Sequence, residues 1–328
     1  MIFEIARQLR EAGVLGMNKR NADFIMPFNP RSLFPRVDDK VLTKKMAGDN
    51  QIPTPLSYHV IEHQGDIAVL EEKLAGQNQF AVKPARGAGG SGIILVMDRR
   101  GQTFITQSGE VISREDFVQH LSDILSGIYS LGGLEDRAIL EALIHPDPVF
   151  AAVAYQGVPD IRIVVYRGIP VMSMVRLPTR ASDGKANLHR GAIGVGIEIH
   201  SGVAITSVHR SQIITHHPDT GNPVSGILVP YWNEILLMAA RTMDMTGLGY
   251  IGVDMVIDRK QGPMLLELNA RPGLAIQMAN RSGLLKRLEA VEKAPVAVFA
   301  SPESRVAWAK EAFKETPSPL GGEGRGEG

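Results

Sequence analysis

The stretch that decides the fold lies near the C-terminus: Gly252-Val253-Asp254, followed by Leu265-Leu266-Glu267-Leu268-Asn269-Ala270-Arg271-Pro272-Gly273. Two apolar runs, at 251–257 and 263–268, flank the polar segment 258–262. Short apolar runs on either side of a polar, glycine-containing turn are typical of a β-hairpin. The sequence therefore predicts two short paired strands at this point.

Three polar side chains interrupt these apolar runs: Asp254, Glu267 and Asn269. Side chains alternate between the two faces of a strand, so Glu267 and Asn269 point to the same face. If the strands pair, Asp254 can join them. Two carboxylates and an amide are hard oxygen ligands, which suit Mg²⁺ and leave room for substrate phosphates. The residues alone also allow a hairpin whose polar side chains simply face solvent.

Composition bounds the class of protein. The chain has 328 residues, enough for two or three lobes. Lys plus Arg and Asp plus Glu both number 35, so bulk charge does not indicate a nucleic-acid-binding surface. Cysteine is absent, which excludes disulfides and thiolate nucleophiles and fits a cytoplasmic protein. No apolar run approaches the ~18 residues of a membrane span.

The rest of the chain alternates between helix and strand signals. An N-terminal helix and an irregular arm are expected over 1–37, and the segment 178–192 is expected to be polar and mobile. Helices are expected at 39–48, 66–75, 114–130, 230–246, 282–292 and 302–315. Strands are expected at 56–61, 79–83, 93–97, 138–143, 161–167, 170–177, 193–199 and 203–208.

A second informative stretch is a glycine-rich loop, residues 84–92, which directly follows Lys83. Gly87, Gly89 and Gly92 match G-x-G-x-x-G, but a strand rather than a helix follows, which excludes a dinucleotide fingerprint. A kinase loop is excluded because its lysine lies on the following strand. The pattern indicates a flexible flap whose backbone N–H groups approach phosphates, with Lys83 as a nearby point charge. The other interpretation is a plain surface turn.

With these two blocks the chain resembles the ATP-grasp superfamily, and most closely its α-L-glutamate ligase-like branch, over about residues 36–275. Four further blocks carry the resemblance in the family's order: Asp39-Lys40 with Ile52-Pro53-Thr54-Pro55, Ile139-Leu140-Glu141-Ala142-Leu143-Ile144, Asp160-Ile161-Arg162, and Asn187-Leu188-His189-Arg190-Gly191. The resemblance implies an α+β ATP-grasp fold, in which two α/β lobes clasp ATP, with a shortened N-terminal pre-grasp region.

The resemblance also implies a division of the chain. The N-terminal helix and arm would occupy 1–37, the first lobe 38–140 with its flap at about 80–97, and the second lobe with the metal site 141–300. A C-terminal helix would occupy 301–316. The tail, 317–328, is rich in glycine and is expected to be disordered.

Roles for single residues follow from the resemblance only. Lys40 and Lys83 would contact ATP phosphates, the backbone around 141–143 would pair with adenine, and Asp147 would reach ribose. The implied ATP-binding set is Lys40, Lys83, Arg86, Gly87, Gly89, Gly90, Ser91, Gly92, Glu141, Ala142, Leu143, Asp147 and Asn187. Arg162, Arg190 and Arg271 would be catalytic, facing the acceptor carboxylate and the transferring phosphoryl group. Asp254, Glu267 and Asn269 would hold Mg²⁺ or Mn²⁺.

The activity that the resemblance implies is an ATP-dependent carboxylate–amine ligase, which forms an amide bond through an acyl phosphate. It would add glutamate or another amino acid to an amine acceptor. Two features depart from the glutamate ligases. Only 39 residues precede Lys40, so a partner subunit or a homo-oligomer could supply an acceptor-binding lobe. The region 216–232 resembles ATP-grasp proteins associated with sugar transfer.

Two alternatives therefore stay open. One is an ATP-grasp ligase or phosphotransferase acting on a saccharide or a cell-envelope precursor, and the other is a non-catalytic ATP-binding regulatory protein. A zinc site at His216-His217 is not expected, because adjacent side chains of an extended segment point to opposite faces.

Overall fold

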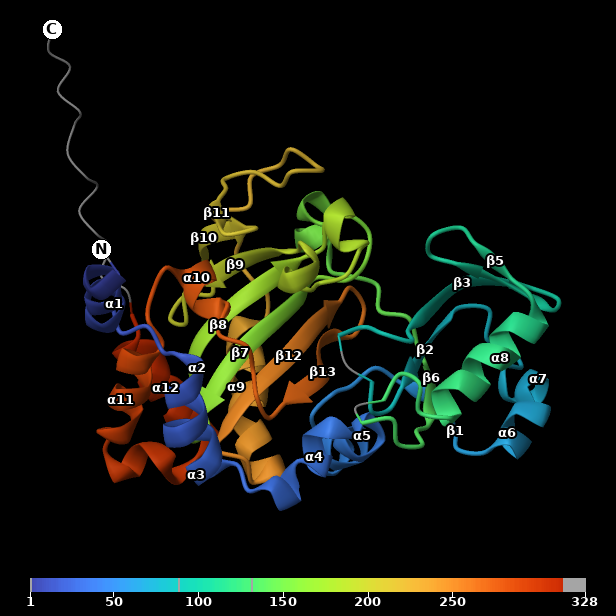
Figure 1. Ribbon diagram of the computed structural model, residues 1–328, viewed down its shortest axis with the longest axis horizontal. Helices are drawn as coiled ribbons and strands as arrows, with labels where there is room; N and C mark the ends of the chain where they lie inside the picture. The colour runs from blue at the N-terminus through green and yellow to red at the C-terminus, as the bar shows by residue number, and fades with distance from the viewer. Residues whose placement is uncertain (1, 88, 131, 315–328) are drawn as a thin grey trace, which may run out of the picture.

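The computed structural model of the chain describes residues 2–87, 89–130 and 132–314. Figure 1 shows two antiparallel sheets side by side, each with its own helices, which confirms the expected α+β class. The predicted disorder of the tail lies outside the described residues. Among the described helices, none combines the length and apolar character needed to cross a membrane.

The smaller sheet has the strand order β1-β6-β2-β3-β4-β5. Its strands are β1 (Ser57–Ile61), β2 (Phe80–Pro84), β3 (Ile94–Arg100), β4 (Thr103–Thr106), β5 (Val111–Ile112) and β6 (Ala138–Glu141). The helices α6 (Gln64–Ala68), α7 (Leu70–Lys73) and α8 (Arg114–Leu125) cover one face (Figure 1). Phe104 and Phe117 stack at a centroid distance of 4.2 Å in the core between them.

The larger sheet has the strand order β11-β10-β9-β8-β7-β12-β13. Its strands are β7 (Asp160–Tyr166), β8 (Ile169–Leu177), β9 (Ile193–Ile197), β10 (Ala204–His209), β11 (Gln212–Ile213), β12 (Tyr250–Asp258) and β13 (Gly262–Asn269). The helices α9 (Trp232–Thr246), α10 (Ile276–Asn280), α11 (Leu285–Glu292) and α12 (Pro302–Ala312) pack against it. The predicted hairpin of β12 and β13 is confirmed.

The N-terminal segment belongs to the core of the larger sheet, since Leu15, Phe24, Ile25 and Val37 are buried in it. This segment runs through α1 (Ile2–Glu11), α2 (Met17–Lys19), the π-helical turn Arg20–Ile25, α3 (Met26–Phe28) and α4 (Pro35–Asp38). It leads into α5 (Lys40–Asp49), which lies between the two sheets in Figure 1.

Several predicted helices have different bounds. The helix expected at 66–75 is divided into α6 and α7, because Val69 leaves helical geometry at φ −103° and ψ 20°. The helix expected at 114–130 ends at Leu125, because Gly127 turns the chain with a φ of +84°. Tyr231 adopts a left-handed conformation, so α9 begins at Trp232 rather than at Pro230. Helix α10 was not expected.

Candidate functional site

The β12–β13 hairpin places the predicted metal ligands on one face of the larger sheet. Asp254 lies opposite Glu267 and Gly252 opposite Asn269, with a bulge after Asp254. On its other side, Asp254 lies opposite Arg162 of β7. Directly opposed residues of antiparallel strands project to the same face. The register therefore brings together Asp254, Glu267, Asn269 and Arg162, of which the alternation pattern of the hairpin predicts the first three.

Asp254 belongs to a buried cluster of two carboxylates and two guanidinium groups, here called the arginine cluster: Asp160, Arg162, Arg176 and Asp254. Arg162 donates from Nε and Nη2 to the two oxygens of Asp254, at 2.6 and 2.5 Å. Arg176 donates to Asp254 Oδ2 at 2.9 Å, and its Nε and Nη2 donate to Asp160 at 2.5 Å each. Sequence reasoning missed Arg176, which only the β7–β8 register brings opposite Asp160.

Charge and burial act in opposite directions within the arginine cluster. Burial raises the pKa of Asp254, but Arg162 and Arg176 outweigh it and hold this pKa below its ordinary value. Burial, together with the neighbouring charge of Asp254 and against the pull of Arg176, raises the pKa of Asp160 to about 6. The pKa of Arg176 is raised, because its two carboxylate partners outweigh burial. The two guanidinium groups thus stabilise ionised Asp254.

The donor set still fits a divalent cation. The described residues contain no group of three His, Cys, Asp or Glu side chains that could hold a metal ion, so the predicted set depends on the amide of Asn269 as its third ligand. Glu267 is half-buried and forms no side-chain hydrogen bond with the described residues. Asn269 Oδ1 accepts from the Arg271 N–H at 2.9 Å. An ionised carboxylate has about four acceptor sites, of which the arginines use three at Asp254, so Oδ1 keeps one for a metal.

A second cluster, here called the lysine cluster, joins the smaller sheet to α5 and consists of Lys44, Lys83 and Glu141. Lys83 on β2 and Lys44 on α5 each donate to one oxygen of Glu141 at 2.5 Å. Glu141 is 3% exposed. Burial raises the pKa of Glu141, but the two lysines outweigh it and hold this pKa below its ordinary value. Sequence reasoning missed Lys44, although it lies one helical turn after Lys40.

Lys40 connects the lysine cluster with the flap. Its Nζ donates to the Gly87 carbonyl at 2.6 Å, and its backbone N–H donates to the Ala85 carbonyl. Burial lowers the pKa of Lys40 below its ordinary value, partly opposed by the carboxylate of Glu267. The start of α5 therefore lies near β13, in agreement with the packing of α5 against this strand.

The flap itself meets the larger sheet's loop over 185–190. Gly89, Gly90 and Gly92 have φ values of +64°, +76° and +74°, which favour glycine. A Cβ on Gly89 would lie 3.9 Å from the amide nitrogen of Asn187. Asn187 caps the 3₁₀ turn Leu188–Arg190 by accepting from the His189 N–H. Arg190 on this turn is exposed; its backbone N–H donates to the Asn187 carbonyl, and its guanidinium group has no hydrogen-bond partner among the described residues.

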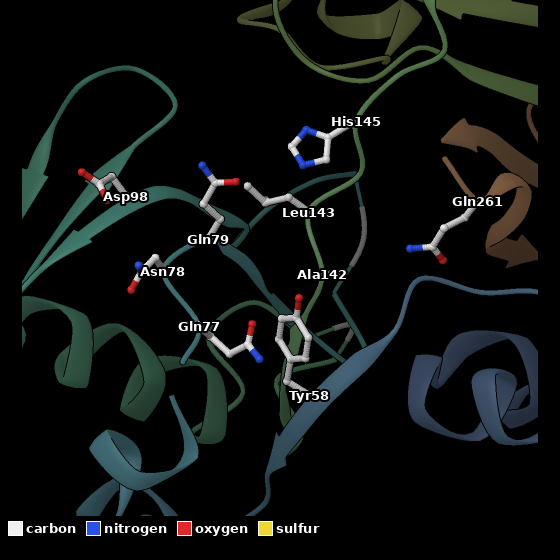
Figure 2. Close-up of a pocket in the computed structure, with 9 residues that line it drawn as sticks. All are labelled: Tyr58, Gln77, Asn78, Gln79, Asp98, Ala142, Leu143, His145 and Gln261. Atoms are coloured by element: carbon white, nitrogen blue, oxygen red, sulfur yellow. The ribbon is translucent and has the colours of Figure 1, made fainter. Parts of the chain in front are cut away.

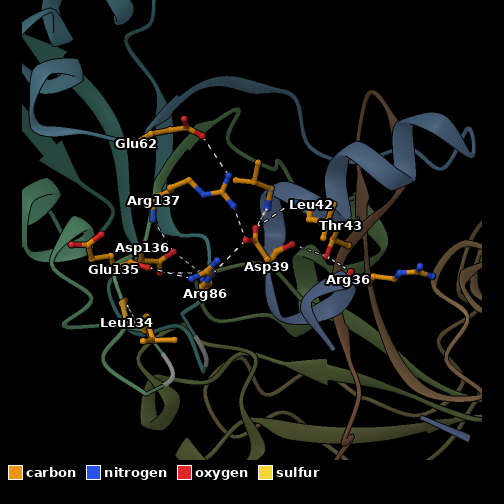
Figure 3. Close-up of polar contacts among 12 residues, drawn as sticks. Arg36, Asp39, Leu42, Thr43, Glu62, Arg86, Leu134, Glu135, Asp136 and Arg137 are labelled. Carbon is orange, nitrogen blue, oxygen red and sulfur yellow. Dashed lines mark hydrogen bonds and ion pairs between the residues drawn. The ribbon is translucent and has the colours of Figure 1, made fainter. Parts of the chain in front are cut away.

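Asp39 anchors the helix that carries Lys40 and Lys44 (Figure 3). Its carboxylate caps α5 by accepting from the N–H groups of Val41 and Leu42. The same carboxylate pairs with Arg137 at 2.5 Å and with Arg86 at 3.4 Å. Arg86, expected at ATP, is therefore partly engaged in holding α5 against the end of β2.

A pocket of about 570 Å³ opens beside the segment that leaves β6. Ala142 and Leu143, expected near adenine, line it together with Tyr58, Gln77, Asn78, Gln79, Asp98, His145 and Gln261 (Figure 2). The Ala142 N–H donates to the Leu56 carbonyl, so this group is already used within the protein. Asp147 is not part of the lining, and instead caps the 3₁₀ turn Pro148–Val153.

His217 has a structural role. It is buried, its Nε2 lies 3.0 Å from the Pro178 carbonyl, and its Nδ1 accepts from the N–H groups of Asp219 and Thr220. These contacts fix the neutral tautomer with hydrogen on Nε2. Both ring nitrogens of His217 are therefore engaged within the protein.

Comparison with solved structures finds several similar proteins. An ATP-grasp ligase named PsnB, solved in complex with a minimal precursor, is 14% identical with a TM-score of 0.43, and the match covers 80% of this chain and 62% of that one. A D-alanine–D-alanine ligase from Bacillus anthracis is 13% identical with a TM-score of 0.42, and the match covers 86% of this chain and 68% of that one. A RimK-domain ATP-grasp protein from Sphaerobacter thermophilus is 14% identical with a TM-score of 0.40, and the match covers 80% of this chain and 70% of that one.

The chain thus spans about three fifths of the length of the first of these, 62%. Among curated protein sequences, none matches it significantly. A model of the family described as sugar-transfer associated ATP-grasp matches residues 19–293, which include both sheets and the complete site. The chain therefore belongs to the sugar-transfer associated ATP-grasp family.

Proposed function

We propose that the protein is an ATP- and Mg²⁺-dependent ligase that activates a carboxylate as an acyl phosphate and transfers it to an amine. The observation that carries the proposal is the opposition of charges across the two sheets. Three cations lie near one another: Lys40, Lys44 and Lys83. Glu141 is the carboxylate that pairs with Lys44 and Lys83. Glu267 and Asn269 lie on the other side, and the Glu267 carboxylate influences Lys40.

This arrangement suits phosphoryl transfer, which needs positioning and charge neutralisation more than a protein nucleophile. A carboxylate oxygen attacks the γ-phosphorus, and the bond to the bridging oxygen breaks to release ADP. The amine then attacks the acyl carbon, loses a proton, and releases inorganic phosphate. Lys40 and Lys83 would bind the phosphates as point charges, while the fixed guanidinium groups hold Asp254 ionised.

Asp254, Glu267 and Asn269 are the residues that would hold the cation. Bound Mg²⁺ would supply neutralisation of the charge on the transferring phosphoryl group. The exposed Arg190, on the loop that meets the flap, would bind the carboxylate substrate. The division into lobes at 38–140 and 141–300, a cytoplasmic location and a partner subunit or homo-oligomer are further parts of this proposal.

The test is ADP release by the purified protein with ATP and Mg²⁺, against a panel of amino acids, amines and saccharide acids. Glu267→Gln is the informative inactive variant, because the Glu267 side chain forms no hydrogen bond with the described residues and the substitution preserves its shape. We expect about a 10²–10³-fold lower rate with an unchanged free energy of unfolding. The surface variant Glu234→Gln is the matched control and should behave as the wild type. Equal turnover by wild type and Glu267→Gln would remove the metal assignment.

A second candidate is a ligase or phosphotransferase whose acceptor is a saccharide or a cell-envelope precursor. The family description, sugar-transfer associated ATP-grasp, favours this acceptor class over a free amino acid. The same panel separates the two, since release that requires a saccharide acid or an amino sugar would favour the second. Nucleotide binding without ADP release across the panel would instead favour the non-catalytic regulatory protein.

A further inference from the structure

The N-terminal arm, here residues 17–38, packs against the larger sheet and contacts the segment that directly follows β13. Asn29 is 3% exposed and uses its whole side chain there. Its Nδ2 donates to the carbonyls of Tyr250 and Ala270 at 2.6 and 2.9 Å, and its Oδ1 accepts from the Tyr250 N–H at 2.9 Å. One amide thus ties the first residue of β12 to the residue that follows Asn269.

Arg20 holds the other end of the same loop. Its side chain is buried, with the residue 8% exposed, and Nη1 donates to the Pro272 carbonyl at 2.8 Å. Asn21 accepts from the remaining guanidinium nitrogens and fixes the plane of the group. Pro272 in turn lies directly over Gly252, where an added Cβ would be 2.7 Å from the Pro272 Cβ. The loop is therefore folded back tightly over β12.

Of the residues assigned to the site, Arg271 lies between these two anchors and Asn269 directly precedes the first of them. Asn269 Oδ1 accepts from the Arg271 N–H, and the Arg271 guanidinium lies 5.5 Å from the ring centroid of Phe34, also in the arm. The contact geometry is that of a cation–π interaction. The arm thus touches the segment before Arg271, the side chain of Arg271, and the segment after it.

We infer that Arg20, Asn29 and Phe34 are positioning residues, which set Asn269 and Arg271 for the metal and the phosphates. The inference rests on the proposed function, because it concerns the same metal-binding edge. Removal of residues that contact metal ligands and fix their orientation commonly weakens metal binding by about 10- to 100-fold. The arm is then part of the active site without touching the substrate.

Arg20→Lys and Arg36→Lys form a matched pair of variants. Both arginines belong to the arm, and each donates from Nη1 to one backbone carbonyl at 2.8 Å, Arg20 to Pro272 and Arg36 to Thr246 at the end of α9. In both cases lysine keeps the positive charge but lacks the planar guanidinium group with its several N–H donors. We would measure the Mg²⁺ concentration that half-saturates ADP binding by calorimetry, together with amide hydrogen exchange at 270–273.

Arg20→Lys should raise the half-saturating Mg²⁺ concentration about tenfold, whereas Arg36→Lys should leave it unchanged even where both lower the melting temperature. Phe34→Leu should raise the half-saturating Mg²⁺ concentration by a smaller factor, and it keeps the test available if Arg20→Lys fails to fold. Equal Mg²⁺ requirements in the matched pair would overturn the inference.

Failure of the proposed function has a different signature. If the wild type releases no ADP from ATP but still binds ADP with Mg²⁺, the comparison of Mg²⁺ requirements still applies. If the wild type binds no ADP, amide exchange alone decides the positioning role. Faster exchange at 270–273 in Arg20→Lys than in Arg36→Lys would sustain the role of the arm. Equal exchange rates in the two variants would refute it.

Discussion

The two buried charge clusters, one on the larger sheet and one that joins the smaller sheet to α5, are built differently. The arginine cluster pairs two guanidinium groups with two carboxylates and is neutral as a set. The lysine cluster pairs two ammonium groups with one carboxylate and has one positive charge in excess. A neutral cluster of planar guanidinium groups and carboxylates is suited to fix neighbouring strands. An excess positive charge on flexible lysine side chains is suited to bind an anion.

The difference also separates two uses of a buried carboxylate. Asp254 receives three hydrogen bonds from planar groups and keeps one acceptor site. Glu141 receives one ammonium on each oxygen and neutralises only part of the charge that surrounds it. We therefore expect that loss of Asp254 is felt first as loss of stability, and loss of Lys83 first as loss of nucleotide affinity.

The largest expected effect is that of Asp254→Asn. It leaves Arg162 and Arg176 buried with only Asp160 as counter-charge, and breaking a buried ion pair on one side costs about 3–5 kcal/mol. Glu141→Gln should cost less, about 1.5–3 kcal/mol, because a lysine deprived of its partner can give up its proton. Urea unfolding of the two variants measures both costs. A larger cost for Glu141→Gln would contradict the assignment of the rigid role to the arginine cluster.

The two clusters are not equally predictable from the sequence, for physical reasons. Local alternation indicates which residues of one hairpin share a face, so the sequence alone groups Asp254, Glu267 and Asn269. The partners of Asp254 lie on β7 and β8, 92 and 78 residues away along the chain, and no local pattern specifies that register. Lys44 reads as an ordinary polar position of a helix until the packing of α5 against Glu141 is known.

The arm illustrates the same limit. Asn29-Pro30 reads as a turn, and its contacts to Tyr250 and Ala270 span 221 and 241 residues. The flap was predictable because glycine spacing and the preceding Lys83 are local features. The capping of α5 by Asp39 was local as well, but its pairing with Arg137 was not. Local chemistry therefore predicted the groups expected to touch ligands better than the groups that hold them.

An intermediate effect is expected from the pair Lys83→Met and Arg176→Met, which removes one cation from each cluster. Lys83→Met leaves Glu141 paired with Lys44, so it should change stability little and weaken ADP binding about tenfold, which is ~1.4 kcal/mol. Arg176→Met should instead lower the free energy of unfolding, because Asp160 loses its cation, with a smaller change in ADP affinity. Calorimetry gives the ADP affinity of each variant, and urea unfolding gives the free energy of unfolding of each. The same pattern of losses in both variants would remove the distinction between the clusters.

The smallest effect is a pH dependence, which separates ammonium from guanidinium groups. Burial lowers the pKa of Lys40 and of Lys44, whereas the carboxylates around Arg176 raise its pKa. As pH rises towards the ordinary lysine value of 10.5, the native protein therefore loses lysine charge before the unfolded chain does. The native state then binds fewer protons than the unfolded state, so the contribution of these lysines to stability increases with pH.

Phosphate affinity must change in the opposite direction, because it needs the charged form of the same lysines. ADP binding should weaken over this alkaline range in the wild type and stay flatter in Lys40→Arg, since a guanidinium group keeps its proton. Calorimetric titrations at several pH values test this. A parallel pH profile of the two proteins would mean that Lys40 does not contact the phosphates, and that the excess charge of the smaller sheet serves the fold instead.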